Sequence, residues 1–385
     1  MQFAGLALTV ILSLSPIYAT PLLTTSSTLS KRIPVTDCLD VLVFDSPGFQ
    51  NASDASQTIA SVEAFAFLKD LDTDELRQST VNALNSIGFN PGEDAIDTAV
   101  DRLKLFAAVG VPRVTVTVEA EGCSETPKLT ATALEDLGET TSLASFGTCA
   151  APATNGGAEI TLTVNGSDFS SARIFPSGPD GFGVISDIDD TVKISHSLDT
   201  LQLVQATLFD EPAPIPGMPE VYASLARSLN SPQFIYVSGS PYQLYPFLRD
   251  FIDTTFSASN GPLFLTNVTV TDLNVLFQTL TADDGNATLV YKIGQLTRIH
   301  EMYPGKSFLT VGDSTQQDPE TYATIYNTFG GDFVRCIWIH LVEGADNSDE
   351  RFKTAFEGVP QERIRLYTDD QIPELAYVDV AGGQC

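Results

Sequence analysis

The sequence predicts an α/β protein in which a doubly wound, mostly parallel, Rossmann-like sheet follows a smaller β-rich domain. Two observations support this prediction. From residue 183 onward, short apolar strands alternate with amphipathic helices, which is typical of right-handed βαβ units. Between residues 110 and 178, β-branched residues are concentrated between Gly, Pro and Asn turns, which predicts a small antiparallel unit, a β-sandwich.

The first 32 residues are typical of a targeting and processing segment. Residues 1–19 contain a short apolar run ended by Pro16, which predicts a signal peptide and is too short to span a bilayer. Residues 20–32 are rich in Ser and Thr and end in the dibasic pair Lys31-Arg32, which predicts a pro-segment removed by a protease. We therefore expect the protein to be secreted or to reside in the secretory pathway.

Two folded domains are predicted after this leader. Residues 33–178 are expected to form a helix-plus-β-sandwich domain, in which residues 93–110 have helical apolar spacing and end at a glycine. The loop-forming stretch "PSGPDGFG" marks the boundary, and residues 179–385 form the α/β domain. We find no set of residues in the first domain that suggests catalysis.

Sequons and cysteines extend the secretory interpretation. Four Asn-x-Ser/Thr sequons predict N-glycosylation at Asn51, Asn165, Asn267 and Asn286. Cys336 lies in the apolar run "FVRCIWIHL" and is predicted to be a free thiol in the core. The other four cysteines would form two disulfides in one of three pairings among Cys38, Cys123, Cys149 and Cys385.

The charge restricts the partners of the protein. With 49 acidic and 20 basic residues, the net charge is −29, which disfavours nucleic acid as a partner and repels anionic membranes at long range. A partner that carries phosphate must therefore be met by a local positive site, most simply a bound cation. No segment after the leader is apolar enough to span a membrane, so only transient contact with a membrane surface is expected.

Polar residues follow several strand-like runs of the predicted α/β domain. Asp187 and Asp189 follow one such run, and Ser238, Lys292 and Asp313 each follow another. Ligands of open α/β sheets bind at the carboxyl ends of the strands, so these side chains are expected to converge on one crevice.

Several carboxylates, a hydroxyl and a lysine suit phosphoryl transfer assisted by Mg²⁺. Mg²⁺ is bound by a few carboxylates and by phosphate oxygens. Asp187 could attack phosphorus, and Asp189 could carry the proton to the leaving oxygen and later from water. Ser238 and Lys292 could hold the phosphoryl oxygens.

Other interpretations of "DIDD" explain less of the sequence. An EF-hand Ca²⁺ loop would need Gly at position 192, which is Val192 here. A glycosyltransferase Asp-x-Asp site would leave Lys292 and the Gly-Asp pair at residues 312–313 unexplained. Asp190 is expected to be a structural or solvated carboxylate.

The four motifs in this order resemble those of the haloacid dehalogenase superfamily of phosphotransferases. The Asp-x-Asp-x-Thr motif matches residues 187–191, the strand-end hydroxyl matches Ser238, and the lysine matches Lys292. The final Gly-Asp with a second Asp matches residues 312–318. The resemblance implies the fold of that superfamily for residues 179–385.

A closer resemblance is to the catalytic domain of fungal actin-patch phosphatidate phosphatases, of which this chain would be a secreted relative. It rests on "SDIDDTVK", "YVSGSPYQLYPFLRDF" and "FLTVGDSTQQDPETYATI", and covers roughly residues 180–340. It implies an Mg²⁺-dependent hydrolase that converts phosphatidate, or a related lipid phosphate, to diacylglycerol and phosphate.

The resemblance also implies roles for individual residues. Asp187 would be the nucleophile and a metal ligand, and Asp189 would be the acid/base and lend its backbone carbonyl to the metal. The further metal ligands would be Asp313 and Asp318. The phosphate would be bound by Thr191, Ser238 and Lys292.

The chain departs from these relatives at two positions. Thr315 stands where the relatives usually have Gly, and His340 stands where they usually have Arg. We expect His340 to be a satisfied core or rim residue and not a ligand. Four residues near the motifs are candidate substrate contacts: Lys193, His196, Gln243 and Tyr245.

Two other functions remain open at this point. The acidic site could hold a cation and a phospholipid head group or another phospho-ligand without catalysis. Alternatively, the enzyme could hydrolyse a phosphomonoester that is not a lipid.

Overall fold

The computed structural model describes residues 39–68, 73–133, 137–150, 158–167, 169, 171–267 and 285–385. All described residues belong to one compact unit, which spans residues 38–385. The predicted signal peptide and pro-segment lie outside the described residues, as does Cys38. No helix within the described ranges is long and apolar enough to cross a bilayer.

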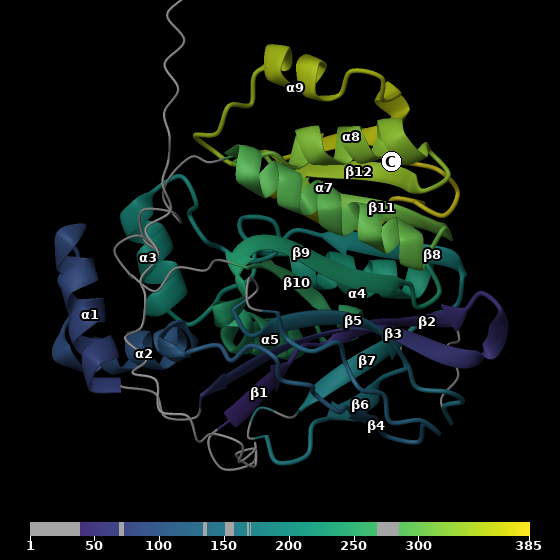
Figure 1. The fold of residues 1–385 in the computed structure, drawn as a ribbon. Helices are drawn as coiled ribbons and strands as arrows, with labels where there is room; N and C mark the ends of the chain where they lie inside the picture. Colours follow the sequence, from purple (N-terminus) through teal and green to yellow (C-terminus); the bar gives the residue numbers. More distant parts are fainter. Residues whose placement is uncertain are drawn as a thin grey trace, which may run out of the picture. The chain divides into compact units, whose positions relative to one another are not determined.

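The N-terminal strands form one seven-stranded sheet of mixed direction (Figure 1), in the order β1-β3-β2-β7-β6-β4 with β5 paired to β3. Its strands are β1 (Leu39–Val43), β2 (Ser46–Asn51), β3 (Asp54–Leu68), β4 (Glu119–Ala120), β5 (Glu139–Ser145), β6 (Ile160–Thr163) and β7 (Ala172–Pro176). The expectation of a purely antiparallel sandwich is wrong, because β2 and β7 pair in parallel. Parallel pairing requires a long crossover, and the chain from β3 to β6 supplies it.

The long strand β3 explains why this sheet needs no second sheet against it. Its side chains alternate between two cores, as a strand with two buried faces requires. Ala60 and Val62 face the core of the mixed sheet, whereas Phe65 and Phe67 face a core shared with the α/β layer. The ring of Phe65 lies 5.2 Å from that of Tyr242, which belongs to the α/β layer. One face of the mixed sheet is thus buried against the second sheet's helices and loops.

The second sheet has six strands, which all run parallel in the order β10-β9-β8-β11-β12-β13. The strands are β8 (Asp180–Ser186), β9 (Gln233–Pro241), β10 (Leu263–Thr266), β11 (Gly305–Asp313), β12 (Val334–His340) and β13 (Ile364–Tyr367). The predicted α/β class with a parallel sheet is confirmed. The strand order reverses between β8 and β11, and ligands of doubly wound sheets bind at such a point.

Helices cover both faces of the parallel sheet (Figure 1). On β8, Val184 packs into the core with α4 and α5, whereas Ile185 packs into the core with α7 and α8. The helices of this layer are α3 (Thr200–Leu208), α4 (Met218–Ser228), α5 (Tyr245–Thr255), α7 (Gly285–Met302), α8 (Asp318–Phe329), α9 (Asp349–Ala355) and α10 (Ile372–Leu375).

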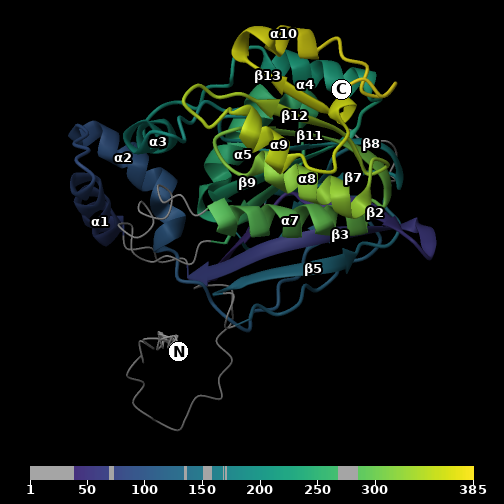
Figure 2. The same ribbon diagram turned by 90° about the horizontal axis from the view of Figure 1, so that it is seen from above.

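Two N-terminal helices, α1 (Thr73–Ser86) and α2 (Glu93–Leu103), lie beside α3 at one end of the unit, as both views show (Figures 1 and 2). The predicted helix at residues 93–110 is shorter than expected. It ends at Leu103 and is followed by a 3₁₀ turn, Lys104–Ala107.

The apolar run before Lys292 forms a helix and not a strand. Lys292 lies inside α7, so the expectation that it follows a strand is wrong. A short apolar run does not distinguish the two by itself. Further along the chain Leu296 and Ile299 are fully buried, and this spacing places them on the same face of the helix.

The cysteines pair differently from the prediction. Cys336 is bonded to Cys385, with 5.4 Å between their Cα atoms, so it is not a free thiol. Cys123 is bonded to Cys149, one of the pairs that the sequence left open. The burial of Cys336 was predicted correctly, but the apolar run could not show that residue 385 lies against β12.

Candidate active site

The first motif leaves the sheet at the end of β8. The backbone N–H of Asp187 donates to the carbonyl of Val311 on β11, 2.9 Å away, which places Asp187 where the strand order reverses. The chain then turns tightly, and the N–H groups of Val192 and Lys193 both donate to the carbonyl of Ile188 at 3.0 Å.

Asp190 holds this turn in shape. Its backbone has a φ of 54°, a left-handed conformation in which aspartate is several-fold enriched among non-glycine residues. Its carboxylate accepts hydrogen bonds from the backbone N–H groups of Ser195, His196 and Ser197. Of the two alternatives predicted for Asp190, a structural or a solvated carboxylate, the structure shows the first.

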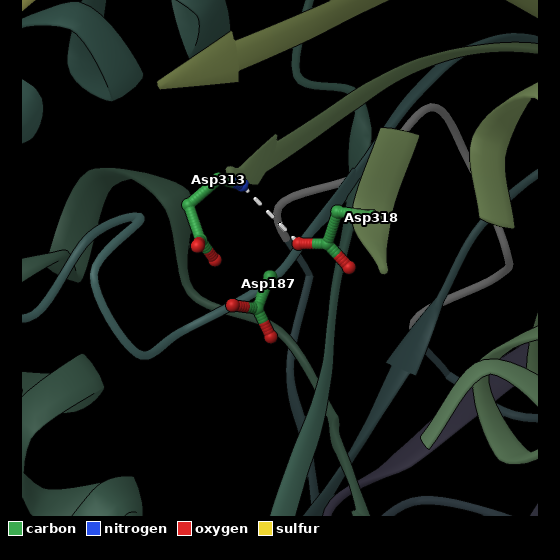
Figure 3. Close-up of side chains that lie close together, drawn as sticks. All are labelled: Asp187, Asp313 and Asp318. Atoms are coloured by element: carbon green, nitrogen blue, oxygen red, sulfur yellow. Dashed lines mark hydrogen bonds between the residues drawn. The ribbon is translucent and has the colours of Figure 1, made fainter. Parts of the chain in front are cut away.

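Two further carboxylates come from the end of β11 and the start of α8. Asp313 is the last residue of β11, and Asp318 is the first of α8. The N–H of Asp313 donates to Asp318 Oδ2 at 3.2 Å, the contact drawn in Figure 3. A Cβ atom at Gly312 would lie 2.3 Å from Asp318 Oδ2, so this close approach requires glycine.

Asp187, Asp313 and Asp318 form a compact cluster of buried carboxylates (Figure 3). One oxygen of each lies within 4.8 Å of the others. Lys292 Nζ lies 2.9 Å from Asp187 Oδ1 and 2.5 Å from Asp318 Oδ1. Although the part of α7 before Lys292 was expected to be a strand, the structure brings Lys292 beside Asp187 and Asp318.

The charges of this cluster do not balance. Burial raises the pKa of Asp187 well above its usual value, although the ammonium of Lys292 opposes the shift. Burial, together with the neighbouring Asp318, also raises the pKa of Asp313 to about 6. The carboxylates in turn raise the pKa of Lys292 above its usual value against the effect of burial, so Lys292 remains an ammonium.

The side chains of this cluster can be compared with the ligands that a divalent cation prefers. Three buried carboxylates share one ammonium, and uncompensated buried charge is costly. Hard oxygen ligands from a few carboxylates are what Mg²⁺ prefers. The residues therefore fit a hard divalent cation, which Asp187, Asp313 and Asp318 would hold.

The side chain of Asp189 lies apart from this cluster, among hydroxyl groups. Its Oδ1 accepts a hydrogen bond from Ser195 Oγ at 2.6 Å and lies 3.3 Å from Lys193 Nζ. Its Oδ2 accepts hydrogen bonds from Ser240 Oγ at 2.7 Å and Ser238 Oγ at 3.3 Å. Burial raises the pKa of Asp189, but Lys193 and these hydrogen bonds outweigh it and lower the pKa overall.

The two predicted phosphate-binding hydroxyls are buried between these groups. Thr191 Oγ1 lies 3.4 Å from an oxygen of Asp187 and 3.4 Å from an oxygen of Asp313. Ser238 contacts Asp189 as described. The structure thus brings the residues of all four motifs together.

The four candidate substrate contacts differ in burial and in the residues that surround them. Lys193 is only 1% exposed and contacts Asp189, whereas His196 is exposed. Gln243 lines a pocket of about 260 Å³ beside α5. Tyr245 is buried, and its hydroxyl accepts the N–H of Asp45 at 2.7 Å, which joins it to the N-terminal sheet.

Thr315 and His340, the two residues that differ from the expected motif pattern, contact residues next to the cluster or in it. The backbone N–H and the hydroxyl of Thr315 donate to Asp313 Oδ1. His340 is buried; its Nδ1 lies 2.8 Å from the carbonyl of Asp190 and its Nε2 lies 2.8 Å from Asp369 Oδ1. The prediction that His340 is a satisfied core or rim residue is confirmed, because it is buried and both ring nitrogens have partners.

Sequence reasoning missed three residues that support the site. Ser195 and Ser240 bind the carboxylate of Asp189. Arg351 of α9 donates to the carbonyls of Ser314 and Gln316 and so holds the loop between Asp313 and Asp318. The only signal for Ser240 was its position two residues beyond Ser238; nothing in the sequence indicated Arg351.

The sequon asparagines are accessible to different degrees. Asn51 is half-buried, and the other three are exposed: Asn165, Asn267 and Asn286. Glycosylation at these residues stays a prediction.

Comparison with known proteins agrees with this geometry. Residues 182–341 match the family model of the catalytic domain of phosphatidate phosphatase APP1, and all four motifs lie inside this range. Over 175 residues the chain is 30% identical to phosphatidate phosphatase APP1 of Saccharomyces cerevisiae, which is 43% of this chain and 28% of the yeast protein. The predicted resemblance to this catalytic domain is confirmed, although the chain matches less than a third of the yeast protein's length.

Proposed function

We propose that this protein is an Mg²⁺-dependent phosphatase of the haloacid dehalogenase type that hydrolyses phosphatidate to diacylglycerol and phosphate. The observation that carries the proposal is the cluster of Asp187, Asp313 and Asp318 with Lys292, inside the segment that matches a phosphatidate phosphatase catalytic domain. The cation would neutralise charge on the carboxylates and on the phosphoryl group.

The first chemical step is an attack on phosphorus by a carboxylate oxygen of Asp187. A bond forms between that oxygen and phosphorus, the bond from phosphorus to the glycerol oxygen breaks, and Asp189 in its protonated form gives its proton to the leaving oxygen. Lys292 keeps Asp187 oriented and carries positive charge beside the phosphoryl oxygens, and Ser238 and Thr191 offer hydroxyl groups to them.

The second step removes the phosphoryl group from Asp187. Asp189, now ionised, accepts a proton from water as the water oxygen bonds to phosphorus, and the bond between phosphorus and Asp187 breaks. Phosphate leaves and Asp187 is a carboxylate again.

The test is release of inorganic phosphate from dioleoyl phosphatidate and from p-nitrophenyl phosphate, each with and without Mg²⁺. We expect release from phosphatidate only with Mg²⁺, and a loss on the order of 10⁴-fold in Asp187→Asn. Asp332→Asn is the matched control, because Asp332 is exposed and precedes β12, at the amino end of the sheet. Release from the aryl ester alone would remove the lipid substrate, and release from neither would favour a binding protein.

We further propose that the protein acts in the secretory pathway or outside the cell. The predicted leader, the four sequons and the two disulfides support this, because disulfides persist in oxidising compartments. Protein isolated from culture medium should lose mass on enzymatic removal of N-glycans. Purely intracellular protein without glycans would contradict the proposal.

A further inference from the structure

A second buried lysine, Lys193, lies beside the acid/base candidate. It is 1% exposed, and its Nζ lies 2.7 Å from Ser195 Oγ and 3.3 Å from Asp189 Oδ1. A buried ammonium needs partners, and these two atoms supply them. Lys193 is therefore committed to the side chain of Asp189 and is not open to solvent as a free phosphate ligand would be.

Asp189 is surrounded by donors on both of its oxygens. Oδ1 faces Lys193 and Ser195, which belong to the turn after β8, and Oδ2 faces Ser240 and Ser238, which belong to the end of β9. Charge-assisted hydrogen bonds are stronger than neutral ones and impose more geometry. Four donors from two elements thus fix both the position and the rotation of this carboxylate.

The two buried lysines of the site divide its carboxylates between them. The ion pairs of Lys292 run to Asp187 and Asp318, whereas the ion pair of Lys193 runs to Asp189. This separation keeps the carboxylate that attacks phosphorus and the carboxylate that moves a proton in different, independently held positions.

We propose that Lys193, together with Ser195 and Ser240, is a positioning residue that holds Asp189 for proton transfer to the leaving oxygen. The inference rests on the proposed function. A general acid must lie within hydrogen-bond reach of the atom it serves, and a displacement of about 1 Å can cost about 100-fold in rate. Loss of the ammonium would let the carboxylate rotate away from that position.

The test uses the need of the leaving group for a proton. An alkoxide leaving from dioctanoyl phosphatidate needs the proton of Asp189, whereas p-nitrophenolate is a stable anion that needs it far less. We expect Lys193→Met to lower kcat about 100-fold with phosphatidate but less than about 5-fold with p-nitrophenyl phosphate, with KM little changed for either. The ratio between the two substrates does not depend on the fraction of enzyme that is folded.

Four further variants complete the design. Asp189→Asn removes the proton donor itself and so gives the largest difference in kcat loss between phosphatidate and p-nitrophenyl phosphate. Ser240→Ala removes a hydrogen-bond donor to Asp189 Oδ2 and should change the ratio of kcat between the two substrates in the same direction, by a smaller factor. Lys193→Arg keeps a positive charge and should bring this ratio part of the way back to the wild-type value. Lys306→Met is the matched control, because Lys306 is also buried but lies near the amino end of β11, where its Nζ donates to the carbonyl of Asp180.

The outcomes separate this inference from the proposed function. Suppose that Asp189→Asn lowers kcat more with phosphatidate than with p-nitrophenyl phosphate. If Lys193→Met then lowers kcat by the same factor with both substrates, or raises only KM, Lys193 does not position Asp189. If Asp189→Asn itself shows no such effect, the proton-transfer step of the proposed function fails, and the inference fails with it. A changed ratio in Lys306→Met would also contradict the inference, because it would show that any buried lysine has this effect.

Discussion

Two clusters of carboxylates in the described part of the chain differ in how their charge is balanced. In the first, which we call the docking cluster, Asp45 of the N-terminal sheet and Asp253 of α5 face Arg173 and Arg249. Arg173 lies 2.6 Å from Asp45 Oδ2 and 2.5 Å from Asp253 Oδ1. Asp45 is buried and Asp253 is 30% exposed; both have guanidinium partners, and the cluster joins the mixed sheet to the α/β layer.

Within the described part of the chain, the second cluster, Asp187, Asp313 and Asp318, forms ion pairs with Lys292 alone. Burial raises the pKa of Asp187 and Asp313, and it also raises the pKa of Asp45 against its two guanidinium partners, so the number of cations and not the direction of the pKa shift separates the two clusters. A cluster whose carboxylates are balanced by arginines stabilises the fold. A cluster with excess negative charge is suited to bind a ligand that brings positive charge. The same residue type thus has two uses, and the number of cations distinguishes them.

The largest effect expected from this difference is on catalysis. Asp313→Asn should reduce phosphate release from dioctanoyl phosphatidate on the order of 1000-fold while the variant remains folded, because the carboxylate serves the ligand more than the fold. Mg²⁺ should raise the Tm of the wild type and leave that of the variant nearly unchanged, since a ligand stabilises only the state that binds it. Thermal unfolding with and without Mg²⁺ measures these changes in Tm. An equal rise of Tm in the wild type and in Asp313→Asn would contradict the difference drawn between the two clusters.

The docking cluster should behave in the opposite way. Arg173→Met leaves Asp45 with one guanidinium fewer in a buried position and should lower the free energy of unfolding by about 3 kcal/mol. Turnover per folded molecule should change little. Urea unfolding and phosphate release, measured on the same preparation, test both statements.

The matched control for this variant is Arg77→Met. Arg77 pairs with Asp97 between α1 and α2, but both side chains are exposed, 40% and 75%. Exposed ion pairs contribute about 1 kcal/mol or less. If Arg77→Met cost as much stability as Arg173→Met, burial of the docking cluster would not be the reason for its effect.

A smaller effect is expected from a buried cation with little carboxylate support. Burial lowers the pKa of Lys306 to about 8, below the value of about 10.4 for an exposed lysine. Between these two values the unfolded state binds more protons, so the free energy of unfolding should rise with pH across this window. The rise should amount to about 1–2 kcal/mol and should be absent in Lys306→Met. Urea unfolding at pH 7, 8 and 9 measures it; parallel curves for the two proteins would contradict the assignment.

The sequence predicted the parallel sheet and most of the site because both depend on local patterns. Strand-helix alternation is readable within each unit, and Asp187 and Asp313 lie at strand ends as expected, whereas Ser238 lies inside β9, which continues to Pro241. Lys292 was placed correctly in the site by its order in the motifs, although the expected strand is a helix.

What the sequence could not predict depends on contacts between distant segments. The parallel pairing of β2 with β7 and the bond between Cys336 and Cys385 join residues whose neighbourhoods reveal nothing about their partners. Ser240 and Arg351 act through contacts with Asp189 and with the loop of Asp313, which only the folded chain creates. Isolated polar residues of this kind have no pattern of their own.

The central claim is that Asp187 takes the phosphoryl group from the substrate, and it can be tested by trapping that group on the protein. Wild-type enzyme mixed with Mg²⁺ and ³²P-labelled phosphatidate, then quenched in acid within a single turnover, should retain protein-bound label that hydroxylamine removes, as an acyl phosphate requires. Asp187→Asn should retain none, whereas Asp332→Asn should match the wild type. Release of phosphate at the normal rate without label on the protein, or equal label on Asp187→Asn, would contradict the claim.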